Sequence, residues 1–551
     1  MGVRIMSIPV LYILLSALWG CSRASVAEPF LKGYSEKILT PSLPRELPNV
    51  TESGYLPLAH GTKDALFYAY YTAQRALKSS KGVSGPPILV WLQGGPGCSS
   101  QLGNFYTLGP YKVNKSLMLE PNPGRWNQRY DLLFIDQPVG TGFSIAGERG
   151  VPTDELEIAA DIYIGLQGFF GKHKHLREHP LFITGESYGG KYVPAIGHFI
   201  IEMEAAYGQS RDRQQELQER RQLPKRATDL GPPLFKLTGL AVGNGLTDPA
   251  TQVLQHADTA FFMGMIDMSQ RVQISVMQLR AAQLIAEGAW KEAHAQREEL
   301  MGCIIEWSGV GTLEDFRRFR DYDADKTVDR YLNKPAVKSV LGVPEDLVFE
   351  SCSEKVGEAL GPDVMKSVKP LVPDILSSIP LLLYQGQMDA QDGVASNEPW
   401  IYGLEWHGKD GFQAAERELW KMNKADVAGA DKSAAAAAAC HGSQMRLQGL
   451  GMETSTTERS LREDGDLAVL SASSAAGADR ASGAEDFQGA KGFESTGAEG
   501  KNKVVVGYWK EHSTLTHVII RNAGHMAPHD QPKVAQAMIE RWVDGVLEQQ
   551  S

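Results

Sequence analysis

A serine with a glycine two residues away on either side is the residue best placed for chemistry. It is Ser187 in Gly185-Glu-Ser-Tyr-Gly189, which follows the apolar run 180–184 and precedes a helix-forming stretch. When such a turn joins a strand to a helix, its glycines permit a bend too tight for side chains, and the serine hydroxyl stands at the sheet edge. The bare motif also arises by chance, but this context predicts that Ser187 is a nucleophile.

A serine hydroxyl attacks only when a base removes its proton and a third group orients that base. In α/β-hydrolases the acid and then the histidine follow the serine along the chain. Asp389 and Asp392 both lie just beyond the apolar run 380–384, and their chemistry leaves either open as the orienting acid. His525 comes after the last apolar run and a short Asn-Ala-Gly turn, so it is the preferred base. The competing histidines are His512, His517 and His529.

Backbone N–H groups near the serine are needed to stabilise the oxyanion of a tetrahedral intermediate. The N–H of Tyr188, directly after the serine, is one candidate. The other is expected from the loop Trp91-Leu-Gln-Gly-Gly-Pro-Gly97, because glycines let a backbone approach the substrate closely. An ordinary Gly/Pro turn is the alternative interpretation of this loop. No cysteine pair has zinc-site spacing, and we expect neither a metal nor a cofactor.

The elements that must position these groups are short apolar runs bounded by Gly and Pro. Such continuous runs are typical of strands buried on both faces of a parallel sheet. Helical patterns at 154–170 and 191–206 lie between them, so the alternation predicts an α/β fold, with a mostly parallel sheet and helices on both faces. The runs are 87–92, 131–136, 180–184, 236–242, 380–384 and 516–520.

The composition is that of a large globular protein. Hydrophobic residues make up 42% and charged residues 22% of the 551 residues, which is ordinary for a chain with a sizeable core. The formal charge of −11 argues against a nucleic-acid partner, because phosphate binding needs a positive footprint. Five cysteines in so long a chain do not make a disulfide-framework protein.

Three stretches look inserted into this core. Residues 209–226 are charge-dense, and residues 263–346 are mostly helix-forming and are expected to cap the sheet. Residues 422–502 contain six consecutive alanines and few large apolar side chains, so they cannot bury enough surface to offset their ordering entropy. We predict that this third stretch is a disordered insertion, with a spacer favoured over a regulatory or processing role. The predicted core segments are 28–262, 347–421 and 503–551.

The amino terminus resembles a secretory signal. The apolar run 5–19 follows Arg4, is short for a membrane span, and is followed by small residues that allow cleavage after Ala24 or Ala27. We therefore predict a signal peptide over 1–27, with an uncleaved anchor as the alternative, and a protein that is secreted or delivered to a vacuolar or lysosome-like compartment without remaining in the membrane. The sequons at Asn49 and Asn114 are then candidate glycan acceptors, unless they occur by chance.

Six sequence blocks follow one another along the chain: Trp91–Ser100, Arg125–Asn127, Asp136–Ser144, Gly185–Pro194, Gly243–Gly245 and Arg521–Pro528. Together and in this order they resemble the serine carboxypeptidases, most closely their vitellogenic-like and lysosomal animal branches. The resemblance runs from about Tyr55 to Trp542 outside the insertions. It implies an α/β-hydrolase fold with a helical cap, and removal of C-terminal residues from peptides at acidic pH.

The resemblance also implies a role for individual residues. It selects Asp389 over Asp392, and so implies a triad of Ser187, Asp389 and His525. It further implies that the N–H groups of Gly95 and Tyr188 form the oxyanion hole.

The family binds the free carboxylate of its substrate, and the resemblance implies that Trp91, Gln93 and Glu186 do so here. A carboxyl facing a carboxylate must carry a proton, so activity should fall as the pH rises. The sequence departs from the family pattern twice. Gln93 replaces an asparagine, and Thr107 stands where a second glutamate is usual, so a shared proton between two carboxyls is lost although the Thr107 hydroxyl could still bond to Glu186.

The resemblance implies a Cys98–Cys352 disulfide and leaves Cys303 and Cys440 without assigned partners. It also implies peptide or protein C-termini as substrates, and a homodimer as a candidate assembly. Two other functions stay open: acyl transfer to an acceptor other than water, and a binding or protective partner protein in which the triad is incidental.

Overall fold

A computed structural model describes residues 45–58, 63–75, 84–207, 224–322, 324–427 and 502–550. The predicted signal segment 1–27, residues 209–223 of the charged insertion, residues 428–501 and Cys440 lie outside the described residues.

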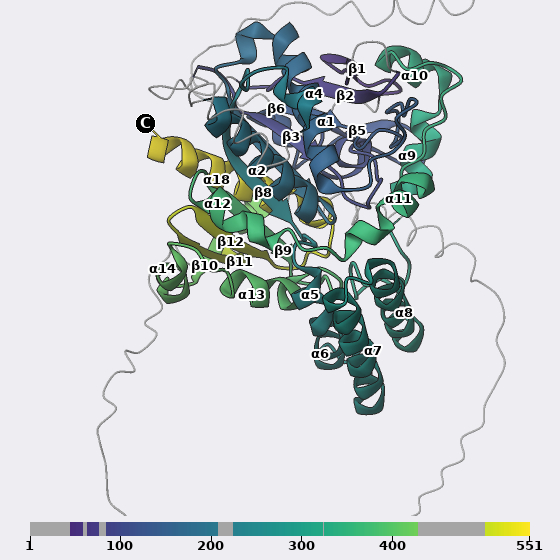
Figure 1. Ribbon diagram of the computed structural model, residues 1–551, viewed down its shortest axis with the longest axis vertical. Helices are drawn as coiled ribbons and strands as arrows, with labels where there is room; N and C mark the ends of the chain where they lie inside the picture. The colour runs from purple at the N-terminus through teal and green to yellow at the C-terminus, as the bar shows by residue number, and fades with distance from the viewer. Residues whose placement is uncertain are drawn as a thin grey trace, which may run out of the picture. The chain divides into compact units, whose positions relative to one another are not determined.

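Within the described residues, ten strands form one sheet in the order β1-β2-β6-β3-β7-β8-β9-β12-β11-β10 (Figure 1). Neighbouring strands from β6 to β12 are all parallel, while β1 and β2 at one edge and β11 and β10 at the other pair antiparallel. The strands are β1 Glu52–Pro57, β2 Ala65–Tyr71, β3 Ile88–Leu92, β6 Asp131–Ile135, β7 Pro180–Glu186, β8 Lys236–Gly243, β9 Leu381–Gly386, β10 Glu418–Asn423, β11 Lys503–His512 and β12 Leu515–Ile520. All six predicted runs are strands of the parallel block.

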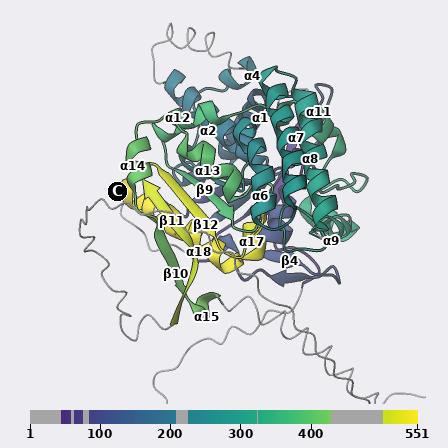
Figure 2. The ribbon, with the colours of Figure 1, turned by 90° about the horizontal axis from the view of Figure 1, so that it is seen from below.

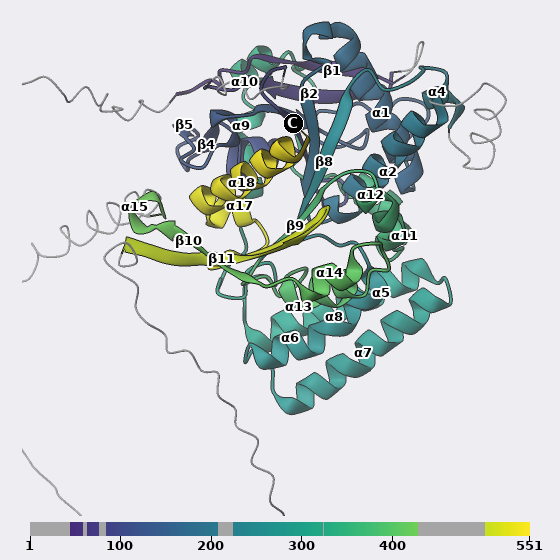
Figure 3. The same cartoon turned by 90° about the vertical axis from the view of Figure 1, so that its left-hand side faces the viewer.

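Strand β3 shows why these runs are apolar throughout. Ile88, Val90 and Leu92 pack with helices α1 (Glu155–Lys172) and α2 (Gly189–Tyr207) on one face of the sheet. Leu89 and Trp91 pack on the other face, in the cluster that includes α18 (Pro532–Gln550). Figure 3 shows α1 and α2 on one side of the sheet and α18 on the other. Because both faces are covered, the alternating polar positions of a half-exposed strand are absent here.

A set of helices forms the cap. Helices α6 (His256–Phe262), α7 (Met268–Ala286) and α8 (Trp290–Ser308) lie side by side in Figure 2, and in Figure 3 they project below the sheet. Helices α9 (Ala324–Leu332) and α10 (Pro335–Leu341) complete the stretch that was expected to be a helical cap, 263–346.

The remaining elements connect the core. The further α-helices are α4 Lys225–Thr228, α5 Pro249–Gln252, α11 Glu354–Val364, α12 Val372–Leu376, α13 Val394–Tyr402, α14 Lys409–Ala414, α15 Lys424–Val427 and α17 Ala527–Asp530. The other short elements are the π-helix η1 Gly103–Thr107, the 3-10 helices η2 Trp126–Gln128, η3 Lys174–Leu176, η4 Val253–Gln255 and η5 Lys369–Leu371, and a second sheet of β4 Tyr111–Val113 and β5 Leu119–Pro121. No helix of the described residues has the length and apolar character needed to cross a lipid bilayer.

Two predicted insertion boundaries are wrong. Met422 belongs to β10, which pairs with β11 up to Asn423, and α15 follows directly. Strand β10 belongs to the folded core because it pairs with the edge of β11, and the Trp420 and Trp509 rings lie 5.9 Å apart. The charged insertion likewise ends before Arg226, whose guanidinium in α4 bonds to the carboxylate of Asp161.

Candidate active site

Four neighbouring parallel strands carry the candidate catalytic groups at their carboxyl ends. Ser187 follows β7, Asn244 follows β8, Asp389 lies in the loop after β9, and His525 lies in the loop after β12. The carboxyl edge of an open α/β sheet is where such folds place their sites. The strand order therefore collects at one edge residues that are hundreds of positions apart in sequence.

The turn at Ser187 has the geometry that the motif predicts. Ser187 has a φ of +64°, an unusual conformation for a residue with a side chain, and its side chain is partly exposed. Its N–H donates to Gly243 O at 3.0 Å, and its carbonyl accepts from Leu246 N at 3.0 Å. A Cβ at Gly185 would lie 2.7 Å from Leu92 O, so a larger residue would displace the adjacent strand.

Asp389 and His525 are hydrogen-bonded to each other, as the predicted triad requires. His525 Nδ1 donates to Asp389 Oδ2 at 2.7 Å, and both side chains are buried. The same oxygen accepts a 2.7 Å hydrogen bond from Asn244 Nδ2. Asp389 Oδ1 accepts from the backbone N–H groups of Gln391 and Asp392. Four donors thus fix the orientation of the Asp389 carboxyl beside His525.

The other ring nitrogen of His525 is the one that must meet the serine. Nε2 is buried and has no hydrogen-bond partner among the described residues, so the bond to Ser187 Oγ is not closed in this structure. Catalytic hydrogen bonds are often long before substrate binds and tighten in the complex. Of the three predicted triad residues, Asp389 and His525 are therefore hydrogen-bonded to each other, and Ser187 is not hydrogen-bonded to His525.

The charge of His525 is set by carboxyl groups around it. Burial alone would lower the pKa of His525, but the charges of Asp389 and Glu314, together with the Asp389 hydrogen bond, raise it well above its usual range. The backbone N–H of His525 also donates to Glu314 O at 2.7 Å. The site thus favours the imidazolium that forms when the serine loses its proton.

The competing residues have other roles in the structure. Asp392 is buried and accepts a hydrogen bond from the Arg297 guanidinium of α8 at 3.3 Å, so it ties the cap to the acid loop. His517 Nε2 lies 2.5 Å from Gln385 Oε1 inside the sheet. His529 stacks on the Tyr106 ring with centroids 4.0 Å apart. His512 lines a groove at the other end of the sheet.

A chain of side chains leads from Trp91 to a buried carboxyl beside the serine. Trp91 Nε1 donates to Gln93 Oε1 at 3.0 Å, which turns Gln93 Nε2 towards Glu186 Oε1 at 3.1 Å. Glu186 is fully buried, and its Oε2 has no hydrogen-bond partner among the described residues. Burial raises the pKa of Glu186 to about 8, against the opposing charge of His525 and the Gln93 hydrogen bond. Glu186 is therefore protonated at acidic pH.

Thr107 does not join this chain. Its hydroxyl donates to Gly103 O at 3.2 Å within η1, so the hydrogen bond to Glu186 that the sequence left open is not made. The reason is local, because a threonine in a helical turn readily bonds to the carbonyl four residues before it.

The glycine-rich loop approaches the nucleophile turn closely. A Cβ at Gly94 would lie 2.4 Å from Tyr188 N, and Gly95 has a φ of +110°, which favours glycine. The loop is fixed on its other side by a Cys98–Cys352 disulfide, the pairing that the resemblance implied, and by a hydrogen bond from Ser99 N to Ser351 O at 2.7 Å. The N–H groups expected to form an oxyanion hole thus belong to two backbone segments in contact.

Two residues of the site were not assigned a role from the sequence. Asn244 was visible only as the centre of the Gly243–Gly245 block, and its position after β8 was the available signal. Glu314 lies in the helix-forming cap stretch and carried no signal, because the structure brings it to His525 through tertiary contacts.

The predicted glycan acceptors differ in their surroundings. Asn49 is exposed, whereas the amide of Asn114 is partly buried and donates to Glu120 Oε1 at 2.7 Å. Cys303 is a free, partly exposed thiol on α8.

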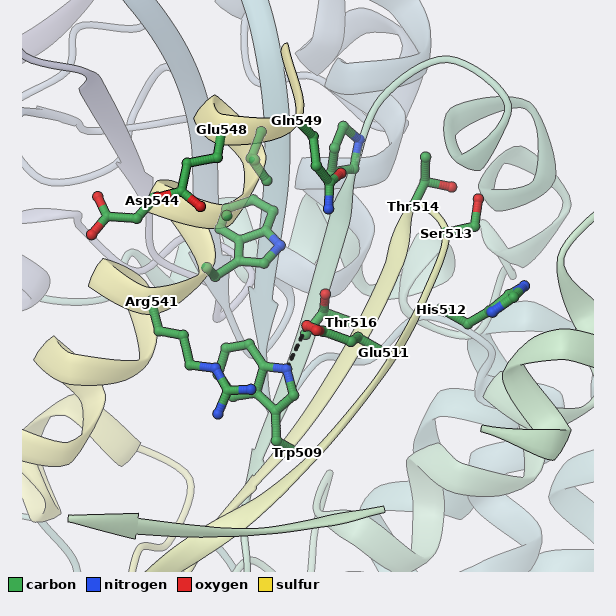
Figure 4. A pocket seen from close by; sticks show the side chains of 14 residues that line it. Trp509, Glu511, His512, Ser513, Thr514, Thr516, Arg541, Asp544, Glu548 and Gln549 are labelled. Atoms are coloured by element: carbon green, nitrogen blue, oxygen red, sulfur yellow. Dashed lines mark hydrogen bonds between the residues drawn. The ribbon is translucent and has the colours of Figure 1, made fainter. Parts of the chain in front are cut away.

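A groove of about 620 Å³ lies away from this site, between the β11–β12 turn and α18 (Figure 4). Its lining residues Ser513 and Thr514 precede β12, whereas His525 follows the opposite end of that strand. Figure 4 shows Arg541 over the Trp509 ring, and Trp509 Nε1 donates to Glu511 Oε2 at 2.6 Å. None of the triad groups lines this groove.

Comparison with known proteins agrees with the geometry. The sequence profile of the serine carboxypeptidase family matches residues 41–441 and 464–545. The chain belongs to the serine carboxypeptidase family. Serine carboxypeptidase-like 50 of Arabidopsis thaliana is 41% identical over 381 residues, which cover 69% of this chain and 79% of the relative. Probable serine carboxypeptidase CPVL of Dictyostelium discoideum is 32% identical over 475 residues, which cover 85% of this chain and 74% of the relative.

A solved structure shows the same fold. The chain of KEX1(delta)p, a prohormone-processing carboxypeptidase from Saccharomyces cerevisiae, superimposes with a TM-score of 0.62 and 21% sequence identity, covering 90% of this chain and 91% of that one. At this identity the likeness shows the fold alone. Family membership makes the protein a serine-type carboxypeptidase, a hydrolase that acts on peptides.

Proposed function

We propose that this serine carboxypeptidase releases the C-terminal residue of a peptide through an acyl-enzyme on Ser187. His525 takes the hydroxyl proton as the serine oxygen attacks the carbonyl carbon, and Asp389 stabilises the imidazolium. His525 then gives that proton to the leaving amine as the C–N bond breaks. A water that loses its proton to His525 hydrolyses the ester and frees Ser187. The Asp389–His525 hydrogen bond at the edge where Ser187 stands supports this assignment.

The oxyanion of each tetrahedral intermediate would be held by the N–H groups of Gly95 and Tyr188. The close approach of the glycine-rich loop to Tyr188 supports this role. Two preorganised backbone donors stabilise the charge that develops in the transition state without reorganising.

The surroundings of the Glu186 carboxyl are the main support for the proposed exopeptidase activity. Its buried Oε2 lacks a partner one residue before the nucleophile, and as a protonated group it is able to donate a hydrogen bond to a terminal carboxylate. Trp91 orients Gln93, and the Gln93 amide contributes the second polar contact. This arrangement favours a substrate with a free C-terminus at acidic pH.

The experiment compares one peptide with a free C-terminus and the same peptide with an amidated C-terminus, from pH 4 to pH 9. We expect the free peptide to be trimmed at acidic pH and amidation to remove most of the activity. Ser187→Ala should abolish release of the C-terminal residue while leaving the unfolding temperature unchanged. Equal cleavage of both peptides, or an active Ser187→Ala variant, would contradict the proposal.

We further propose that the protein resides in the secretory pathway or a compartment derived from it. The disulfide between Cys98 and Cys352 supports an oxidising environment. Glycosylation at Asn49 is compatible with its exposure and is testable by mass analysis after glycosidase treatment. A homodimer stays a prediction, which sedimentation of the purified protein tests.

A further inference from the structure

A strap from the cap is hydrogen-bonded to both loops of the acid–base pair. Its residues are 313–316, which follow α8. Ala390 N donates to Leu313 O at 2.8 Å, Phe316 N donates to Met388 O at 3.2 Å, and His525 N donates to Glu314 O at 2.7 Å. The backbone of Glu314 is therefore fixed beside the catalytic histidine.

The side chain of Glu314 is a carboxyl whose cationic neighbour is His525, the base of the proposed mechanism. It is partly buried, and no Lys or Arg of the described residues forms an ion pair with it. The nearby guanidinium groups are already engaged, because Arg297 bonds to Asp392 and Arg317 bonds to Asp315. An acidic side chain at a site edge that forms no ion pair with Lys or Arg is available to a positive charge on a substrate.

The groups that act on Glu314 locate it relative to the substrate. His525 would protonate the leaving nitrogen, and Glu186 would hold the terminal carboxylate, so the departing residue lies between them. The hydrogen bond from His525 N to Glu314 O places Glu314 beside the base that would protonate the leaving nitrogen. The charge of Glu314 also acts on His525 and on Glu186. The titratable groups whose charges act on Glu314 or are acted on by it are His525, Asp389, Asp321, Asp392 and Glu186.

We propose that Glu314 is a specificity-determining residue that favours peptides ending in lysine or arginine. This inference rests on the proposed function, because it assumes that the departing residue is held between His525 and Glu186. The ammonium or guanidinium of that residue would form an ion pair with the Glu314 carboxylate.

The preference should depend on pH. Burial raises the pKa of Glu314 to about 7, although the charge of His525 opposes the shift. At acidic pH the group is neutral and offers no charge to a basic residue. As the pH rises through about 7 the group ionises, so selectivity for a basic C-terminal residue should increase.

The test uses two peptides that differ only in a C-terminal arginine or citrulline, which have the same shape and differ in charge. The ratio of their kcat/KM values is measured from pH 5 to pH 8. Both substrates need the same ionisation of His525 and Glu186, so these titrations cancel in the ratio. We expect the arginine-to-citrulline ratio to rise with pH to about tenfold in the natural protein, the size of a partly buried ion pair.

Glu314→Gln should hold this ratio near one at every pH while still cleaving the citrulline peptide, which also shows that the variant folds. Glu306→Gln, which removes an exposed carboxyl of α8, is the matched control and should leave the ratio unchanged. A flat ratio in the natural protein, or an unchanged pH dependence in Glu314→Gln, would overturn the inference. Failure to cleave either peptide would instead contradict the proposed function.

Discussion

The end of β7 and the loop after β9 each bury a carboxyl group at the same sheet edge, but they supply it with different numbers of hydrogen-bond donors. Asp389 accepts four hydrogen bonds, two at each oxygen. Glu186 accepts one hydrogen bond at Oε1 and none at Oε2. Burial raises the pKa of Glu186 to about 8, and the charge of His525 and the single hydrogen bond from Gln93 oppose that shift. Two carboxyl groups at one sheet edge therefore differ in how many hydrogen-bond donors they receive.

The two environments suit the two proposed tasks. In the proposed mechanism, the Asp389 carboxylate stabilises the imidazolium of His525 during acyl transfer. A neutral Glu186 is able to donate to a carboxylate that a charged group would repel. Exchanging the two environments would remove both properties, so variants that alter the donors test the comparison.

The largest effect is expected from Asp389→Asn. The amide keeps the shape of the side chain but removes the charge that supports the His525 imidazolium, so kcat should fall about ten-thousandfold. Steady-state kinetics with a free-terminus peptide measures this loss.

Asp392→Asn is the control for that variant, because it alters the neighbouring carboxyl that bonds to Arg297. It should lower the unfolding temperature while kcat stays within about tenfold of the natural value. A larger loss of kcat in Asp392→Asn than in Asp389→Asn would reverse the assignment of the two acids.

The next largest effect is expected from Glu186→Gln, which should change how kcat/KM depends on pH. In the natural protein, kcat/KM should fall about tenfold per pH unit above a pH of about 8, because Glu186 loses the proton that it donates. The glutamine keeps a donor at every pH, so this alkaline decline should vanish or move to a higher pH. An alkaline decline at the same pH in both proteins would show that another group causes it.

The smallest effect is expected from Asn244→Gly. Glycine tolerates the positive φ of 45° at this position, so the change removes the amide, which donates to Asp389 and accepts from Gly386 N. Losing one of four hydrogen bonds should lower kcat about tenfold. An unchanged kcat in Asn244→Gly would contradict a role for this hydrogen bond.

The parallel strands can be predicted from the sequence because the property that identifies each of them, a continuous apolar run, lies within the strand itself. Strands such as β3 and β9 are covered on both faces, so they appear as continuous apolar runs. The edge strands β10 and β1 were not predicted, because β10 has one buried residue, Trp420, among mostly exposed ones and β1 is only partly buried. Their pairing depends on β11 and β2, which lie elsewhere in the chain.

The residues of the candidate site also differ in how far the sequence alone predicts them. Ser187, Asp389 and His525 each follow an apolar run, so a strand-end rule finds them without knowledge of the fold. The choice between Asp389 and Asp392 needed the family resemblance, since it depends on which carboxyl faces His525. Glu314 could not be found, because the hydrogen bonds that place it join the cap to two distant loops.

The disulfide has a consequence for the integrity of the chain. Cys98 and Cys352 are 254 positions apart, and the nucleophile turn and helices α6 to α10 lie between them. A single proteolytic cut anywhere in that interval would leave two polypeptides covalently joined at the glycine-rich loop. Such a cleaved form would run as one species on a denaturing gel until a reductant separated it into two.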